Sequence, residues 1–97
     1  MSGEHASEFV AECLWPDVGE SDLRALDERV AAAARRLVAD GGWVRYLGSL
    51  LMRDDVVVLC QFTGDLEQVR EVADAARIPY DRILETARSP WPAETGA

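Results

Sequence analysis

VRYLGSLLM at residues 44–52, RDD at 53–55 and VVVLCQF at 56–62 form the stretch that decides the fold. Two apolar runs rich in β-branched and aromatic residues flank a short charged turn. This pattern predicts a β-hairpin. The segments before and after it each supply a helix and a further strand.

The first and last strands are predicted near the two ends of the chain. Residues 8–15 read EFVAECLW and stop at Pro16, a plausible strand terminator. One alternate set of these side chains is wholly apolar, and the other mixes acids with hydrophobes. Residues 81–88, centred on Ile83 and Leu84, predict a shorter, more polar strand, which we expect at an edge of the sheet.

Two amphipathic segments predict helices. Ser21 is the candidate N-cap of the first helix, Asp22 suits its first turn, and Gly41-Gly42 ends it. Asp65 followed by Gln68 resembles a capping box that opens the second helix, which closes at Ile78-Pro79. Three- and four-residue spacing places these residues on the apolar stripe of the first helix: Leu23, Leu26, Val30, Ala33, Ala34, Leu37 and Val38.

The order strand, helix, strand, strand, helix, strand predicts an α+β, ferredoxin-like β-α-β-β-α-β fold. In this fold two helices cover one face of a four-stranded antiparallel sheet. The right-handed crossover places the first and third strands in the centre. We expect one domain over residues 1–97, with an ordered core at 8–88 and tails at 1–7 and 89–97.

Two helices leave the other face of the sheet uncovered, although its strands are apolar. A large exposed apolar patch usually marks an interface, and a second copy about a two-fold axis is the simplest cover. We therefore expect a homodimer packed sheet against sheet, as in a dimeric α/β barrel. The apolar residues left for this face come from Val10, Leu14, Val57 or Val58, Leu59 and the run at 50–52.

Composition narrows the classes of partner. The chain has 97 residues and a net charge of −8, which disfavours binding to nucleic acid. Its apolar runs are too short to span a bilayer, and its N-terminus does not resemble a signal peptide. We expect a cytoplasmic protein with no membrane partner, in which Cys13 and Cys60 are buried reduced thiols on neighbouring central strands.

Glu12 is the most informative polar residue because it lies inside a predicted central strand. Desolvation of its carboxylate by a second subunit would be costly without a partner. Three roles are open: a structural one, in which Glu12 pairs with Arg45, Arg82 or Arg88 or points to water, a ligand or metal contact, and a general base.

Four residues are candidates for ligand binding: Glu12, Cys13, Tyr46 and Gln61. Gln61 is the one polar residue of the apolar run at 56–62, and Tyr46 could line a pocket. His5 is the only histidine, so one chain can build neither a nucleophile–histidine pair nor a multi-histidine metal site.

Several short segments, in this order and spacing, resemble a known family. They are Val10-Ala11-Glu12 with the later Pro16, VRYL at 44–47, DLEQV at 65–69 and IPYDRI at 78–83. The chain resembles the small bacterial ferredoxin-like proteins of unknown function that include nickel-binding members. Cys13 and Phe62 replace an arginine and an acid frequent in that family, and the histidines expected of a nickel site are missing.

The resemblance implies a ferredoxin-like subunit, commonly dimeric, with metal or small-ligand sites near the open sheet face. Two hypotheses of function follow. The first is a non-catalytic dimer that binds a small molecule, or weakly a metal such as nickel, around Glu12. The second is a cofactor-free enzyme, of monooxygenase or cyclase type, that acts on an aromatic or polyketide-like substrate with Glu12 as acid or base. This second hypothesis rests on analogy of fold.

Overall fold

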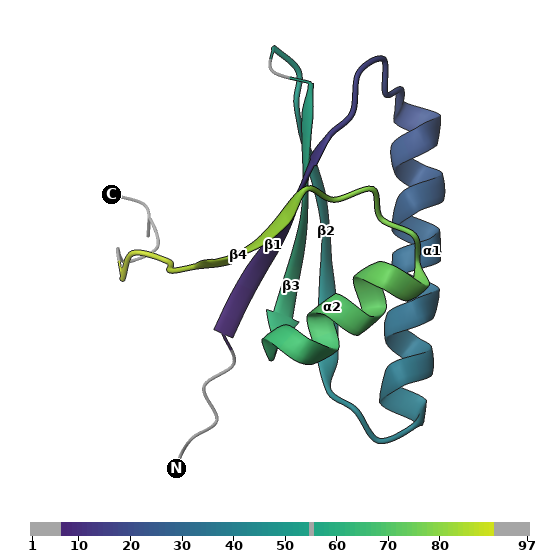
Figure 1. Ribbon diagram of the computed structural model, residues 1–97, viewed down its shortest axis with the longest axis vertical. Helices are drawn as coiled ribbons and strands as arrows, with labels where there is room; N and C mark the ends of the chain where they lie inside the picture. Colours follow the sequence, from purple (N-terminus) through teal and green to yellow (C-terminus); the bar gives the residue numbers. More distant parts are fainter. Residues whose placement is uncertain (1–6, 55, 91–97) are drawn as a thin grey trace, which may run out of the picture.

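A computed structural model of the protein describes residues 7–54 and 56–90. One sheet carries both helices on the same side, as Figure 1 shows. Neither helix in the described part of the chain is long and apolar enough to cross a membrane. The elements follow the expected order: β1 (Ser7–Leu14), α1 (Glu20–Ala39), β2 (Val44–Met52), β3 (Val57–Gly64), α2 (Leu66–Ala75) and β4 (Arg82–Thr86).

The sheet confirms the predicted arrangement of strands. Its order is β2-β3-β1-β4, with every pair antiparallel, so β1 and β3 are central. Phe9 of β1 lies opposite Phe62 of β3, and Glu12 lies opposite Leu59. β4 is the shortest strand and lies at an edge, as its polar sequence predicted.

A β-bulge interrupts β2. Tyr46 pairs with Phe62 and Gly48 pairs with Gln61, so Leu47 is an extra residue without a partner on β3. Gly48 has φ 108°, a conformation that glycine adopts readily because it lacks a Cβ. The bulge reverses the alternation of side chains, so Tyr46 and Ser49 both lie on the helix side despite their odd spacing.

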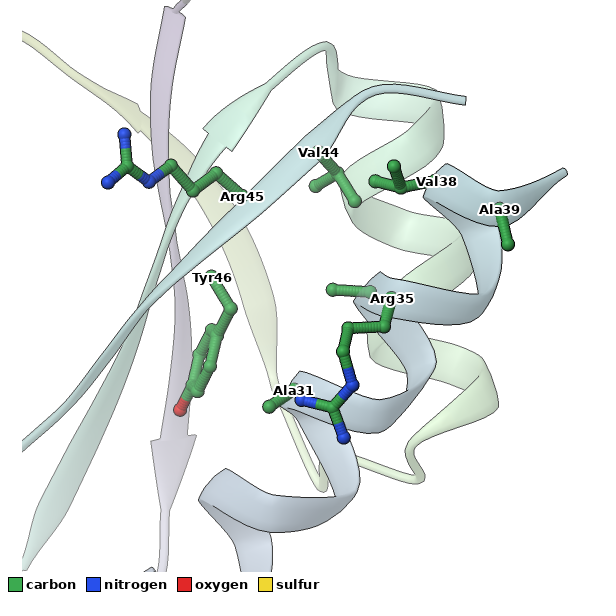
Figure 2. A pocket seen from close by; sticks show the side chains of 8 residues that line it. Ala31, Arg35, Val38, Ala39, Val44, Arg45 and Tyr46 are labelled. Atoms are coloured by element: carbon green, nitrogen blue, oxygen red, sulfur yellow. The ribbon is translucent and has the colours of Figure 1, made fainter. Parts of the chain in front are cut away.

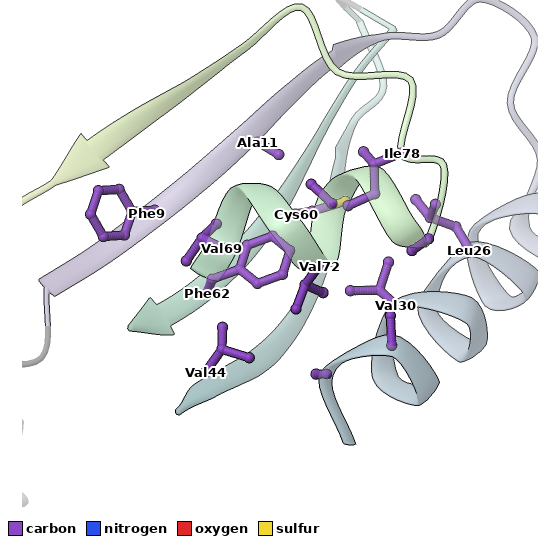
Figure 3. Packing of buried hydrophobic residues seen from close by; sticks show 14 of the residues in the cluster. Phe9, Ala11, Leu26, Val30, Val44, Cys60, Phe62, Val69, Val72 and Ile78 are labelled. Atoms are coloured by element: carbon purple, nitrogen blue, oxygen red, sulfur yellow. The ribbon is translucent and has the colours of Figure 1, made fainter. Parts of the chain in front are cut away.

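The hydrophobic core fills the space between the sheet and the two helices (Figure 3). Phe62 is fully buried at its centre, and the ring of Tyr46 packs against it with centroids 5.1 Å apart. Cys13 and Cys60 are fully buried free thiols, which confirms the expectation for them. The helices contribute these buried side chains: Leu26, Val30, Ala33 and Ala34 from α1, and Val69, Val72 and Ala73 from α2.

The start of α1 corrects one prediction. Ser21 is not the N-cap; Gly19 is, and α1 begins at Glu20. The Asp22 carboxylate accepts a hydrogen bond from the Gly19 N–H at 2.9 Å. A side chain within the first turn of α1 therefore satisfies the N–H of the N-cap residue. Val38, expected on the buried stripe, lies at its margin and is 47% exposed.

The start of α2 follows a local rule, and the helix ends at Ala75, before the predicted close at Ile78-Pro79. Asp65 caps its N-terminus by accepting a hydrogen bond from the Gln68 N–H at 3.1 Å, as predicted. The Gln68 side chain does not return to Asp65, since its Oε1 accepts from the Trp43 N–H at 2.6 Å. This bond joins the start of α2 to the start of β2.

Candidate functional site

The sheet face opposite the helices is an apolar surface that no described helix covers. Alternation along β1 turns Phe9, Ala11 and Cys13 into the core and the intervening residues outward. Leu14 is 61% exposed and Leu50 is 51% exposed. Five further apolar side chains lie on the same open face as Leu14 and Leu50: Val10 of β1, Met52 of β2, Val57 and Leu59 of β3, and Leu84 of β4.

Glu12 lies near the middle of this open face. Its cross-strand neighbours are Arg82 on one side and Leu59 on the other, with Leu50 beyond Leu59. Arg82 Nε donates a hydrogen bond to Glu12 Oε1 at 2.6 Å. Arg82 is therefore the ion-pair partner of Glu12 among the three arginines that the sequence analysis named. The Glu12 side chain is 29% exposed and that of Arg82 is 63% exposed. This hydrogen bond raises the pKa of Arg82 above its ordinary value.

A second ion pair lies four residues away along β1, on the same face. Arg88 Nη2 donates to Glu8 Oε1 at 3.0 Å. A shallow hollow of about 370 Å³ opens beside this pair. Its floor contains Val10, Leu59 and Gln61, so apolar and polar groups meet there.

The four predicted site residues divide between the two sides of the sheet. Glu12 and Gln61 belong to the open face, where Gln61 lines the hollow. Cys13 lies on the helix side and is fully buried. Tyr46 also lies on the helix side and packs against the core. Without a large rearrangement, one small ligand on the open face can reach only Glu12 and Gln61.

The two residues on the helix side both make hydrogen bonds there, and those of Tyr46 belong to a partly buried polar cluster. The Tyr46 hydroxyl donates to Asp27 Oδ1 at 2.6 Å, and Ser49 Oγ donates to the same oxygen at 2.8 Å. Burial, followed by the hydrogen bond to Asp27, raises the pKa of Tyr46 above its ordinary value. A hydrogen bond with Cys60, followed by burial, raises the pKa of the Cys13 thiol. These groups remain protonated at neutral pH and stabilise the core.

Nickel, which the family resemblance implies, does not fit the donor groups of the described residues. Throughout residues 7–54 and 56–90, no three His, Cys, Asp or Glu side chains gather closely enough to hold a metal ion. Arg82 already occupies one oxygen of Glu12. His5 lies outside the described residues. Stable sites for such metals need several converging ligands.

Sequence reasoning missed a second hollow, which lies between α1 and the free edge of β2 (Figure 2). It measures about 530 Å³ and is mostly apolar. Ala31 and Val38 contribute from α1, and Val44 and Tyr46 contribute from β2. The available signal was Val38, an apolar residue at the margin of the helix stripe, but sequence alone does not show what packs beside it.

Comparisons with known proteins support the fold. No protein-family model matches the chain, and no curated protein does. Among solved structures, the chain is similar to the crystal structure of SCO4226 from Streptomyces coelicolor A3(2), with a TM-score of 0.66 and 18% sequence identity. The match covers 84% of this chain and 98% of that one. At this level of identity the likeness shows a shared small α+β fold and carries no function across.

Proposed function

We propose that two copies of this chain pack their open sheet faces together and enclose a binding site for a small organic ligand around Glu12 and Gln61. The observation that carries the proposal is the exposure of Leu14 and Leu50 on a face that no described helix covers. A patch of this kind on a small domain usually marks an interface. An isologous pairing of sheets gives the dimeric α/β barrel expected from the sequence.

The polar groups on this face indicate the chemistry of the ligand. Burial of the Glu12–Arg82 pair would be costly unless both charges keep good hydrogen bonds. A ligand with hydrogen-bonding groups can supply them, with Gln61 as donor and acceptor. Val10 and Leu59 offer the apolar contact beside them. A small, partly apolar molecule with polar groups at one end suits this set. The free buried thiols agree with a cytoplasmic location.

The dimer is tested by sedimentation equilibrium at micromolar protein. We expect a dimer for the natural chain and a monomer for Leu50→Glu, which places a charge on the proposed interface. Leu66→Glu is the matched control, because Leu66 is also exposed but opens α2 on the helix side. A natural chain that remains monomeric would contradict the proposal. So would dissociation of both variants.

Ligand binding is tested by thermal shift with a panel of small aliphatic and aromatic carboxylates, amines and amides. Glu12→Gln and Gln61→Leu should each remove the stabilisation that a hit produces, while the exposed Glu85→Gln, on the other side of β4, should preserve it. Calorimetry with nickel, zinc and copper covers the weak metal binding that the family resemblance implies. If a metal titration releases heat and Glu12→Gln abolishes that heat, the ligand bound at Glu12 is a metal ion and not an organic molecule.

The alternative hypothesis, a monooxygenase or cyclase with Glu12 as acid or base, has no specific observation in its favour. A general base must reach the proton it removes, and Arg82 holds one oxygen of Glu12. Turnover of an aromatic substrate that Glu12→Gln abolishes would establish it.

A further inference from the structure

We propose that the hollow between α1 and the free edge of β2 is a second binding site, and that it takes a small amphipathic carboxylate: an anion with one carboxylate and an apolar body. The hollow lies at the edge of the sheet on the helix side, away from the face assigned to the dimer. It therefore stays accessible whether or not two copies pair. The proposal does not depend on the function proposed above.

The hollow exists because nothing in the described chain closes it. β2 pairs only with β3, so its outer edge carries no further strand. The helix residues that face this edge include Ala31 and Ala34, whose side chains are too short to reach it. At about 530 Å³, the space lies within the range of small-molecule sites, roughly 300–1,000 Å³.

The lining determines the body of the ligand. Val38 and Val44 form the end near the α1–β2 connection, and Tyr46 forms the inner wall (Figure 2). The Tyr46 hydroxyl is already engaged by Asp27, so its ring is the part offered to a ligand. Apolar groups that enter this space leave water without displacing a protein hydrogen bond. An alkyl chain or a small ring suits it.

Arg35 determines the head group. Its exposed guanidinium lies at the rim beside Ala31, and no carboxylate in the described residues forms an ion pair with it. Asp27, two turns earlier on α1, is held by Tyr46 and Ser49. Arg45 also lines the hollow, but its side chain extends across β2 away from α1 (Figure 2).

A guanidinium binds a carboxylate through two parallel hydrogen bonds. One such cation in a chain of net charge −8 suits a singly charged head group better than a phosphate dianion, which the other acids of the chain repel more strongly. The positive charge of Arg35 would repel the head group of a cationic amphiphile. The local charge therefore selects an anion.

The test uses octanoate, octan-1-ol and octylammonium as probes, followed by amide shifts in ¹H–¹⁵N NMR spectra. Octanoate should bind saturably, with the largest shifts at Ala31, Arg35 and Val44. Octylammonium should bind about tenfold more weakly or not at all. No saturable octanoate shift in the millimolar range would overturn the proposal. Equal binding of octylammonium would overturn it too.

Three variants locate the site. Arg35→Gln should weaken octanoate about tenfold and leave octan-1-ol unchanged, because only the carboxylate uses the charge. Arg36→Gln is the matched control: Arg36 is the next residue on α1 and lines other hollows, on the α2 side. Ala31→Met should fill the hollow and abolish binding of both probes. Equal losses for Arg35→Gln and Arg36→Gln, or octanoate shifts confined to the open face at Val10 and Leu59, would overturn the proposal.

Discussion

Tyr46 and Asp27 join β2 to α1 through one short hydrogen bond, with the phenol as donor and the carboxylate as acceptor at 2.6 Å. Ser49 donates to the same carboxylate oxygen at 2.8 Å. The β-bulge at Leu47 brings both donors to one side of the sheet. This three-residue cluster attaches the edge strand to the helix above it.

Removal of either donor should destabilise the protein. Tyr46→Phe should cost about 1 kcal/mol and Ser49→Ala a similar amount, because each deletes one hydrogen bond to a carboxylate that keeps the other. The double variant leaves Asp27 with neither donor and should cost more than the sum of the two. Urea denaturation of the four proteins measures this coupling. Strict additivity would show that the two bonds act independently.

Tyr46 should also make stability depend on alkaline pH. Its pKa is raised in the folded state, so the folded chain keeps a proton that the unfolded chain releases above about pH 10. The contribution is fully present below pH 10 and is lost as the pH rises further. At pH 11 the natural chain should have lost about 1 kcal/mol more than Tyr46→Phe. Urea denaturation of both proteins from pH 8 to 11 checks this, and parallel curves would contradict it.

The two helices end in the same way on different residues. Both close with paired i→i−5 and i→i−3 hydrogen bonds around a left-handed residue: Gly41 after α1, with φ 96°, and Arg77 after α2, with φ 61°. A side chain in this conformation costs about 1 kcal/mol. Arg77→Gly should therefore raise the free energy of unfolding by about that amount.

Gly41→Ala is the matched test of this argument. A Cβ at Gly41 would meet no atom within 4 Å, so any loss of stability comes from the backbone conformation alone. We expect a loss of about 1 kcal/mol in thermal or urea denaturation. A neutral Gly41→Ala together with a neutral Arg77→Gly would show that neither position is strained.

The two thiols should be inert in the folded protein. Cys13 and Cys60 are fully buried, and the raised pKa of Cys13 keeps it protonated. A thiol-reactive dye at neutral pH should label the chain only as fast as it unfolds, and urea should accelerate the reaction. Rapid labelling without denaturant would mean that the core between β1 and β3 opens locally.

Gln68 should act as a link between β2 and α2. Its Oε1 accepts from the Trp43 N–H at 2.6 Å, so Gln68→Met should cost about 1 kcal/mol through loss of that acceptor. Gln68→Glu keeps an acceptor at the same place and should cost less. Urea denaturation compares the two, and equal losses would show that the bond does not contribute.

Local signals in the sequence were reliable where neighbouring residues decide the structure. Asp65 caps α2, and Gly41 ends α1, because each acts on backbone groups within a few residues. The start of α1 was misplaced at Ser21 for a related reason. Asp22 can close the first turn by accepting from Gly19, and nothing in the sequence decides between this arrangement and a serine cap.

Of the candidate site, the sequence located Glu12 in a central strand and named Arg82 among its three possible partners. It could not decide between Arg45, Arg82 and Arg88, because that depends on the register of β4 against β1. It also grouped Cys13 and Tyr46 with Glu12 and Gln61. Strand pairing places the two pairs on opposite sides of the sheet.

The sequence by itself determined the order of elements and the central position of β1 and β3, because apolar spacing and crossover handedness are properties of the chain alone. Only the tertiary structure decided the direction of the side chains along β2. The bulge at Leu47 and Gly48 shifts the alternation by one residue, and a shift of one residue exchanges the two faces of a strand. That exchange places Tyr46 and Ser49 against Asp27 and leaves Leu50 on the open face.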